Sequence, residues 1–294
     1  MAISSLQNRK IKQNLIGLAL IGPAFIIFII FTLIPIFQGV FLAFFKANAR
    51  VSRYIGFDNF IYLINDDLFW KAMKNTVCYV GVAVPLMALI PFYVAIVAQG
   101  MKKKWQGFVR FAFYVPLISA GMIISLVWDW IFNAQFGLLN YLVGLVGAGP
   151  IIWLGTSPAA FFAICIVLIS SSMGMNLILY MSALSSIDKQ IYEAADIDAC
   201  SNAQKVYYLT MPLMLPIIAF VAIMQTIGVA MIWEIIYVLT SGGPYYATIS
   251  LVYQIFIRAF QSGKYGLAAA ESLVVMVIIL ILALIQKKIL IDRE

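Results

Sequence analysis

Six charged side chains gather in one short segment, residues 185–211, between two long apolar runs. They are Asp188, Lys189, Glu193, Asp196, Asp198 and Lys205. Because such groups are costly to place in hydrocarbon, we expect the segment to lie in water. Carboxylate and ammonium groups in this arrangement can pair with opposite charges on another molecule. Docking is therefore the chemistry that the segment indicates.

The sequence has no constellation typical of a catalytic or metal centre. It contains no histidine, and its three cysteines, Cys78, Cys165 and Cys200, are far apart with no Cys-x-x-Cys spacing. It also lacks the Gly-x-x-x-x-Gly-Lys-[Ser/Thr] loop that binds nucleotide phosphates. We therefore predict that this chain has no catalytic residue, binds no metal and no cofactor, and is not an enzyme.

The composition is that of a membrane protein. Of 294 residues, 64% are hydrophobic and 11% are charged, far from the balance of soluble proteins. A crossing helix needs about 20 apolar residues. Runs of this kind cover residues 15–42, 76–98, 111–132, 159–181, 211–240 and 265–285. The sequence thus predicts an all-α membrane protein with about six transmembrane helices, preceded by a short tail at residues 1–14.

The basic residues predict the orientation of these helices. If the N-terminus lies inside, twelve of the 19 Lys and Arg residues fall in inner segments, as the positive-inside rule requires. We therefore expect both termini and residues 185–211 to be cytoplasmic. The net charge of +7 reflects this bias together with contact with anionic lipid headgroups, so nucleic acid is not an expected partner.

The charged segment also carries a sequence motif. Its residues match, in register, the Glu-Ala-Ala, Asp-Gly-Ala and Leu-Pro pattern of ATP-driven importer permeases. The matching positions are Glu193, Ala194, Ala195, Asp198, Leu209 and Pro212. The chain thus resembles the membrane-spanning subunit of a binding-protein-dependent ABC importer, most closely the maltose-type sugar permeases. The resemblance extends from about residue 15 to the end of the chain.

This resemblance implies a fold, a function and a set of partners. The fold would be the type I ABC importer transmembrane fold over residues 15–294, with residues 185–211 as a coupling-helix loop. The function would be ATP-driven import of a carbohydrate or related solute by alternating access across a prokaryotic cytoplasmic membrane. The partners would be a second homologous permease, two cytoplasmic ATPase subunits that use ATP and Mg, an extracytoplasmic solute-binding protein and membrane lipid.

The expected coupling loop consists of two short helices across a bend. We place Glu193 at the start of the first helix, where the helix dipole favours a carboxylate. Ala199 stands where the family usually has Gly, which reaches positive φ without steric cost. We therefore expect the bend to shift towards Ser201 and Asn202. An ordinary solvated loop is the alternative interpretation.

Polar groups inside apolar spans indicate a route for the solute, because burying them in lipid is costly. The fourth and fifth spans each carry such groups on one helical face, and in maltose-type permeases this pair lines the sugar pocket. The candidates are Ser172, Met175, Asn176, Gln225, Gly228, Val229, Ile232, Trp233 and Glu234. The alternative is that Asn176 and Gln225 only form interhelical hydrogen bonds in the permease pair.

Residues 57–70 predict a short amphipathic helix at the outer interface, with Tyr62 and Trp70 as anchors. It would serve either as a plain anchor or as part of the surface on which the binding protein docks.

A different class of protein, an ion-coupled secondary transporter, would need intramembrane carboxylates such as Asp129, Glu234 and Glu271. We expect Asp129 and Glu271 to lie at helix ends or subunit contacts instead, and the internal inverted repeat of such transporters is not evident in the sequence.

Overall fold

The computed structural model describes residues 20–48, 51–118 and 121–290. It divides into two compact units, Met1–Tyr62 with Arg258–Leu273, and Leu63–Ile257 with Val274–Glu294. Within the described residues the elements are helices apart from one antiparallel hairpin of β1 (Phe45–Ala47) and β2 (Ser52–Tyr54). This agrees with the all-α class that the sequence predicts.

The smaller unit contains the first apolar helix and the hairpin. The helix runs over residues 20–42 and includes η1 (Ile29–Leu33) and α2 (Ile34–Leu42), and none of its apolar stretch is buried within this chain. Residues 15–19 of the expected first span, and the tail at residues 1–14, lie outside the described residues. The hairpin packs against the start of α14 (Tyr265–Leu290), where a Cβ on Gly266 would clash with the Phe45 carbonyl oxygen.

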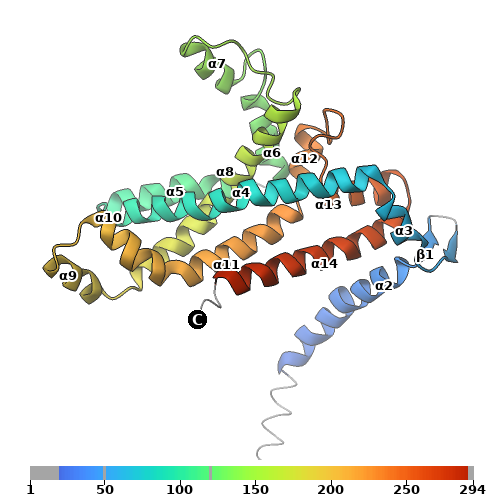
Figure 1. Ribbon diagram of the computed structural model, residues 1–294, viewed down its shortest axis with the longest axis horizontal. Coiled ribbons are helices and arrows are strands. Elements are labelled where there is room, and N and C mark those ends of the chain that lie inside the picture. The colour runs from blue at the N-terminus through green and yellow to red at the C-terminus, as the bar shows by residue number, and fades with distance from the viewer. Residues whose placement is uncertain (1–19, 49–50, 119–120, 291–294) are drawn as a thin grey trace, which may run out of the picture. The chain divides into compact units, whose positions relative to one another are not determined.

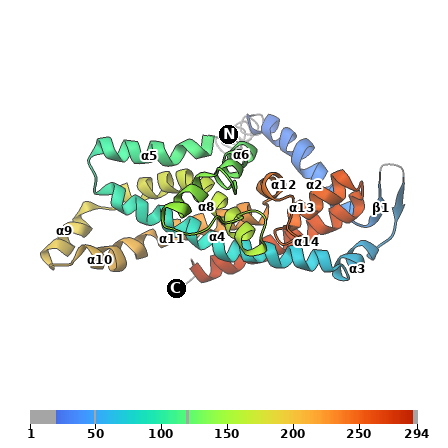
Figure 2. The same cartoon turned by 90° about the horizontal axis from the view of Figure 1, so that it is seen from above.

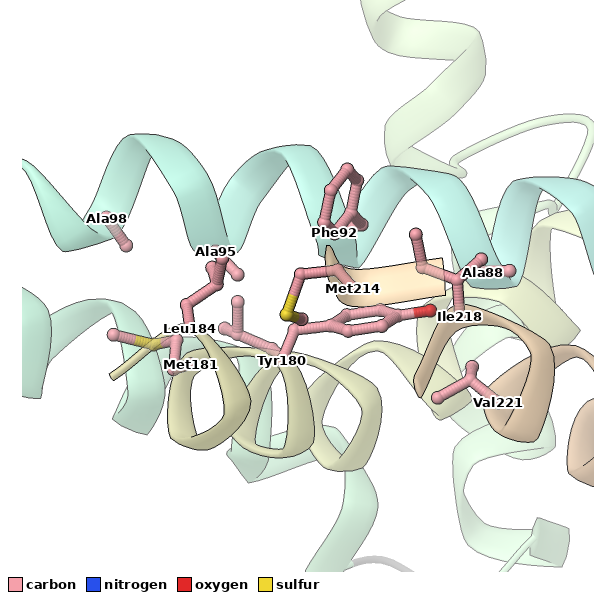
Figure 3. Close-up of a cluster of buried hydrophobic side chains, with 11 residues drawn as sticks. Ala88, Phe92, Ala95, Ala98, Tyr180, Met181, Leu184, Met214, Ile218 and Val221 are labelled. Carbon is pink, nitrogen blue, oxygen red and sulfur yellow. The ribbon is translucent and has the colours of Figure 1, made fainter. Parts of the chain in front are cut away.

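Long helices form the core of the larger unit. They are α4 (Asp67–Gln99), α5 (Lys103–Ile118), α8 (Ser157–Ser185) and α11 (Met211–Ala230). In Figure 1, α4 lies along α8 and α11. Buried alanines of α4, including Ala88 and Ala95, allow this close packing. Figure 3 shows Ala88 and Ala95 of α4 beside Tyr180 of α8 and Met214 of α11, all of them buried.

Two of the expected spans are broken helices. The expected span over residues 111–132 falls on the end of α5 and on α6 (Gly121–Ile131), two helices bent by 94° relative to each other. The expected span over residues 211–240 ends early, because α11 stops at Ala230 and α12 (Glu234–Leu239) begins after a turn. The described residues thus contain five helices suited to cross a membrane, or six if the bent pair is one crossing.

Short helices of the larger unit lie at the two ends of these long helices. At one end are α9 (Lys189–Ile197), α10 (Asn202–Lys205) and η2 (Val206–Thr210), and towards the other are α12 and α13 (Leu251–Phe256), as both Figure 1 and Figure 2 show. The other short elements are α3 (Asp58–Ile64), α7 (Leu138–Leu145) and η3 (Ile257–Gln261).

Candidate functional site

The segment 185–211 folds as two capped helices joined by a tight bend, as the sequence predicts. Asp188 is the N-cap of α9, and its carboxylate accepts a hydrogen bond from the Gln190 N–H at 3.0 Å. Ser201 and Gln204 form a reciprocal capping box at the start of α10, with bonds of 2.8 and 3.3 Å. Since both helices are short, these caps satisfy N–H groups that would otherwise depend on water.

The bend itself lies at Ala199, which adopts a left-handed φ of 52°. The Cys200 N–H donates to the Ala195 carbonyl at 3.0 Å, and the Ala199 N–H donates to the Asp196 carbonyl at 3.1 Å. This pair of bonds is a Schellman motif, which usually has Gly at this position. The expected shift of the bend to Ser201 is therefore wrong, because the two hydrogen bonds hold Ala199 in the strained region.

Glu193 occupies the fifth position of α9 and is exposed. The expectation that it starts the helix is wrong, since the helix begins one turn earlier at Lys189 and Asp188 takes the N-terminal position. The helix dipole therefore gives Glu193 little stabilisation. Its side chain is instead exposed to solvent in the middle of α9.

Two side-chain contacts tie the segment together. Lys205 of α10 forms an ion pair with Asp196 of α9. The Tyr192 hydroxyl lies 3.0 Å from the Thr210 hydroxyl at the end of η2. Because each contact joins α9 to the chain that leads into α11, the two short helices are held as a hairpin. We refer to residues Asp188–Thr210 as the coupling hairpin.

The coupling hairpin carries an open pocket of about 440 Å³. Four of the predicted coupling residues line it, namely Ala194, Ala195, Asp198 and Leu209. Glu193, Ala199 and Pro212 are not among its lining residues, and Pro212 lies in the first turn of α11.

Exposed apolar side chains on the coupling hairpin were missed by the sequence analysis. Ile197 is 87% exposed, and Tyr207 and Tyr208 are also exposed. Large exposed apolar groups that cluster on one element indicate a contact with another molecule. Their apolar character among charged neighbours, Ile197 between Asp196 and Asp198, is the signal that could have identified them.

The candidate pathway residues on the fourth and fifth spans differ in burial and in hydrogen-bond partners. Asn176 is only 2% exposed, and its amide donates to the Met87 carbonyl of α4 at 3.0 Å. Gln225 Nε2 donates to Asn176 Oδ1, also at 3.0 Å. These amides thus join helices inside one chain. The Ser172 hydroxyl bonds within its own helix, to the Ile169 carbonyl at 3.1 Å.

Of the other candidates, Val229 and Ile232 are buried, whereas Met175 and Gly228 are exposed. The predicted faces are therefore only partly exposed, because part of each face packs against neighbouring helices of the same chain.

Trp233 and Glu234 lie where α11 breaks. The Trp233 ring stacks on the Phe256 ring with 4.7 Å between centroids. Glu234 is the first residue of α12 and faces Gly121, the first residue of α6, where a Cβ would lie 2.5 Å from Glu234 Oε2. The starts of α6 and α12, each of which follows a helix break, therefore meet at this carboxylate. We call this place the helix junction.

The other two membrane carboxylates are placed near helix ends. Asp129 lies two residues before the end of α6. Glu271, in the second turn of α14, is buried and accepts a hydrogen bond from Arg258 Nη1 at 2.8 Å. Among the described residues no group of three His, Cys, Asp or Glu side chains could hold a metal ion.

The expected amphipathic helix at residues 57–70 is split in two. Tyr62 lies in α3, while Trp70 lies in the first turn of α4 and donates from Nε1 to the Ile64 carbonyl at 2.8 Å. Both side chains are exposed. The helix is interrupted because Asp66 caps α4, accepting from the Leu68 N–H at 3.1 Å.

Known proteins resemble this chain in sequence and in fold. The chain is 31% identical over 285 residues to the probable ABC transporter permease protein YurN of Bacillus subtilis, covering 95% of this chain and 97% of that one. It is 30% identical over 296 residues to the lactose transport system permease protein LacF of Rhizobium radiobacter, covering 97% of each chain.

Among solved structures, the fold resembles a chain of a bacterial ABC transporter involved in the import of the acidic polysaccharide alginate, with a TM-score of 0.84, 22% identity and 96% of each chain covered. Residues 68–290 match the family described as binding-protein-dependent transport system inner membrane component. The chain therefore belongs to this family of ABC transporter permeases, which are transport subunits rather than enzymes.

Proposed function

We propose that this chain is a permease subunit of an ATP-driven importer that moves a carbohydrate or related solute across the cytoplasmic membrane by alternating access. The observation that carries the proposal is the coupling hairpin, a rigid pair of capped helices with the importer motif. It is connected directly to α8 and, through a continuous helix over residues 202–230, to α11. A displacement of the hairpin would therefore move both helices as rigid bodies.

The energy source in this proposal is a pair of cytoplasmic ATPase subunits that bind ATP and Mg. Exposed Ile197 and Glu193 would contact a groove on such a subunit, with apolar burial and charge complementarity as the attractive terms. Both chain termini would lie on the same, cytoplasmic side. A second homologous permease and membrane lipid would cover the exposed apolar face of residues 20–42.

The carbohydrate class is supported by relatives whose names state it, such as the lactose permease LacF and the trehalose/maltose permease MalF of Thermococcus litoralis. The helix junction supplies suitable chemistry, since Trp233 offers an aromatic face and Glu234 can accept hydrogen bonds from hydroxyls. Met175 and Gly228 are the other accessible candidates. Val229 and Ile232 are buried, so they would pack behind the residues that line the solute route and would not contact the solute.

An ion-coupled carrier is not favoured, because Glu271 is already neutralised by Arg258 in an ion pair. The matched family depends on a binding protein, and the importer proposal accounts for that dependence directly.

The proposal is tested by reversing one charge on the coupling hairpin. In proteoliposomes that hold the whole complex, Glu193→Lys should reduce solute uptake and make ATP hydrolysis either stop or ignore the solute. The matched control is Glu193→Asp, which keeps the negative charge at the same exposed position of α9 and should leave uptake near that of the parent complex. Normal uptake by Glu193→Lys, with the ATPase subunits still bound, would contradict the proposal.

A further inference from the structure

The loop between α12 and α13 presents two exposed tyrosines on a strained backbone. Tyr245 is 93% exposed and Tyr246 is 54% exposed, and their φ angles are 50° and 60°. Ser241, at the start of the same loop, has a φ of 48°. Each non-glycine residue in this region costs about 1–2 kcal/mol. A flexible loop would relax away from such a conformation, so other contacts must hold it.

Those contacts come from one face of α4. Lys71 Nζ donates to the Tyr245 carbonyl at 2.6 Å, Asn75 Nδ2 donates to the Ile249 carbonyl at 3.0 Å, and the Tyr79 hydroxyl donates to the Thr248 carbonyl at 3.2 Å. The three donors are four residues apart, so they form a row along the helix. They bind backbone atoms of the loop, which fixes its path and leaves the Tyr245 side chain free to project.

The loop and the coupling hairpin lie at opposite ends of α4. The loop contacts Lys71, whereas Val97 lines a cavity together with Asn202 of the hairpin. At about 1.5 Å per residue these two positions on the helix are about 40 Å apart, which exceeds the hydrocarbon thickness of about 30 Å. With the hairpin in the cytoplasm, the two tyrosines face the outside.

We propose that Tyr245, with Tyr246 beside it, is an anchor that inserts into a pocket on the extracytoplasmic binding protein. Rigid, exposed aromatic side chains are the residues that most often dominate protein interfaces, and a fixed backbone lowers the entropy lost on docking. The complementary pocket on the partner would be concave and apolar, with an acidic rim towards the Lys71 ammonium group. The inference rests on the proposed function, because it takes the hairpin to be cytoplasmic.

Two other roles fit these observations less well. An aromatic anchor in the lipid interface needs only an amphipathic ring, and a strained backbone held by three side chains would add nothing to it. A site that stacks the solute directly would be concave and would cover the ring, whereas Tyr245 projects almost fully into solvent.

The first test measures how much solute-loaded cognate binding protein half-maximally stimulates the ATPase of the complete complex in nanodiscs. Tyr245→Ala should raise this concentration about tenfold, as expected for an interface hot spot, and Tyr245→Phe should raise it much less. Tyr54→Ala is the matched control, because Tyr54 is 65% exposed but lies in β2 rather than in the strained loop. An unchanged value for Tyr245→Ala would overturn the inference while leaving the proposed function intact, since stimulation itself would persist.

The second test does not depend on an alanine variant folding well. A photo-crosslinking benzoylphenylalanine at position 245 should form an adduct with the binding protein in the same sample. Adducts with lipid alone, while the binding protein still stimulates the ATPase, would assign the loop to the membrane interface and overturn the inference. Loss of all stimulation by binding protein in the unmodified complex would instead contradict the proposed function.

Discussion

Gln225 of α11 donates a hydrogen bond to Asn176 of α8, with 3.0 Å between Nε2 and Oδ1. The amide of Asn176 is in turn bound to the Met87 carbonyl of α4, so two side chains connect three helices. Both α8 and α11 lead into the coupling hairpin. A motion of the hairpin must therefore either carry these helices together or break this bridge.

We predict that Asn176→Ala lowers the free energy of unfolding by about 1–2 kcal/mol, because it leaves a buried carbonyl and the Gln225 amide without a partner. In a double-mutant cycle with Gln225→Ala, the coupling energy should be about 0.6–1.7 kcal/mol. Denaturant unfolding of the complex in detergent measures both values. Ser172→Ala is the control, since its hydroxyl bonds only within its own helix. A coupling energy of zero would mean that the bridge contributes nothing.

A second prediction concerns Glu271, which is buried against Arg258. Glu271→Leu should destabilise the protein by about 3 kcal/mol, because it leaves a buried guanidinium without this counter-charge. Glu193→Leu, which removes an exposed carboxylate, should change stability by less than about 0.5 kcal/mol. Thermal unfolding of the two variants in parallel gives the comparison, and equal melting temperatures would show that the ion pair is dispensable.

A third prediction tests the helix junction. Gly121→Ala should reduce uptake severalfold, because the new Cβ would meet Glu234 Oε2 and displace it. Adding Glu234→Asp, which shortens the side chain by one methylene, should restore part of the uptake. Gly81→Ala is the matched control, since no atom lies within 4 Å of its Cβ position. Uptake by Gly121→Ala at the parent rate would indicate that the position of this carboxylate does not matter.

Hydropathy was sufficient to predict the long helices but not their breaks. The runs that became α4, α8 and α14 are recognisable because about 20 apolar residues suffice to define a crossing helix. The turn between α11 and α12 contains Met231, Ile232 and Trp233, which are apolar and include neither Gly nor Pro. Packing of α12 on α6 and the stacking of Trp233 on Phe256 produce the break, and such tertiary contacts leave no local signal.

Tertiary contacts without a local sequence signal also determined the positions and partners of individual site residues. Helical spacing assigned Asn176 and Gln225 each to one face of its own span, yet it could not indicate whether their partner would be a solute, another subunit or each other. Glu193 was misplaced by one turn, because Asp188 caps the helix earlier than the motif suggested. No local sequence pattern predicted the left-handed, exposed conformation of Tyr245 and Tyr246. That conformation depends on hydrogen bonds from Lys71 and Asn75, which are far away in sequence.

The left-handed bend of the coupling hairpin predicts an unusual response to glycine. Ala199 has a φ of 52°, where a Cβ is strained, so Ala199→Gly should raise stability by about 1 kcal/mol. Ala194→Gly, the same change inside α9 at an exposed position, should lower stability by about 0.5–1 kcal/mol through the cost of glycine in a helix. Because the hydrogen bonds from Ala199 and Cys200 to the end of α9 are unaffected, uptake by Ala199→Gly should stay near normal. Melting temperatures and uptake rates of both variants provide the measurement. If glycine destabilised the protein at both positions alike, Ala199 would not be strained and the left-handed bend would be incorrect.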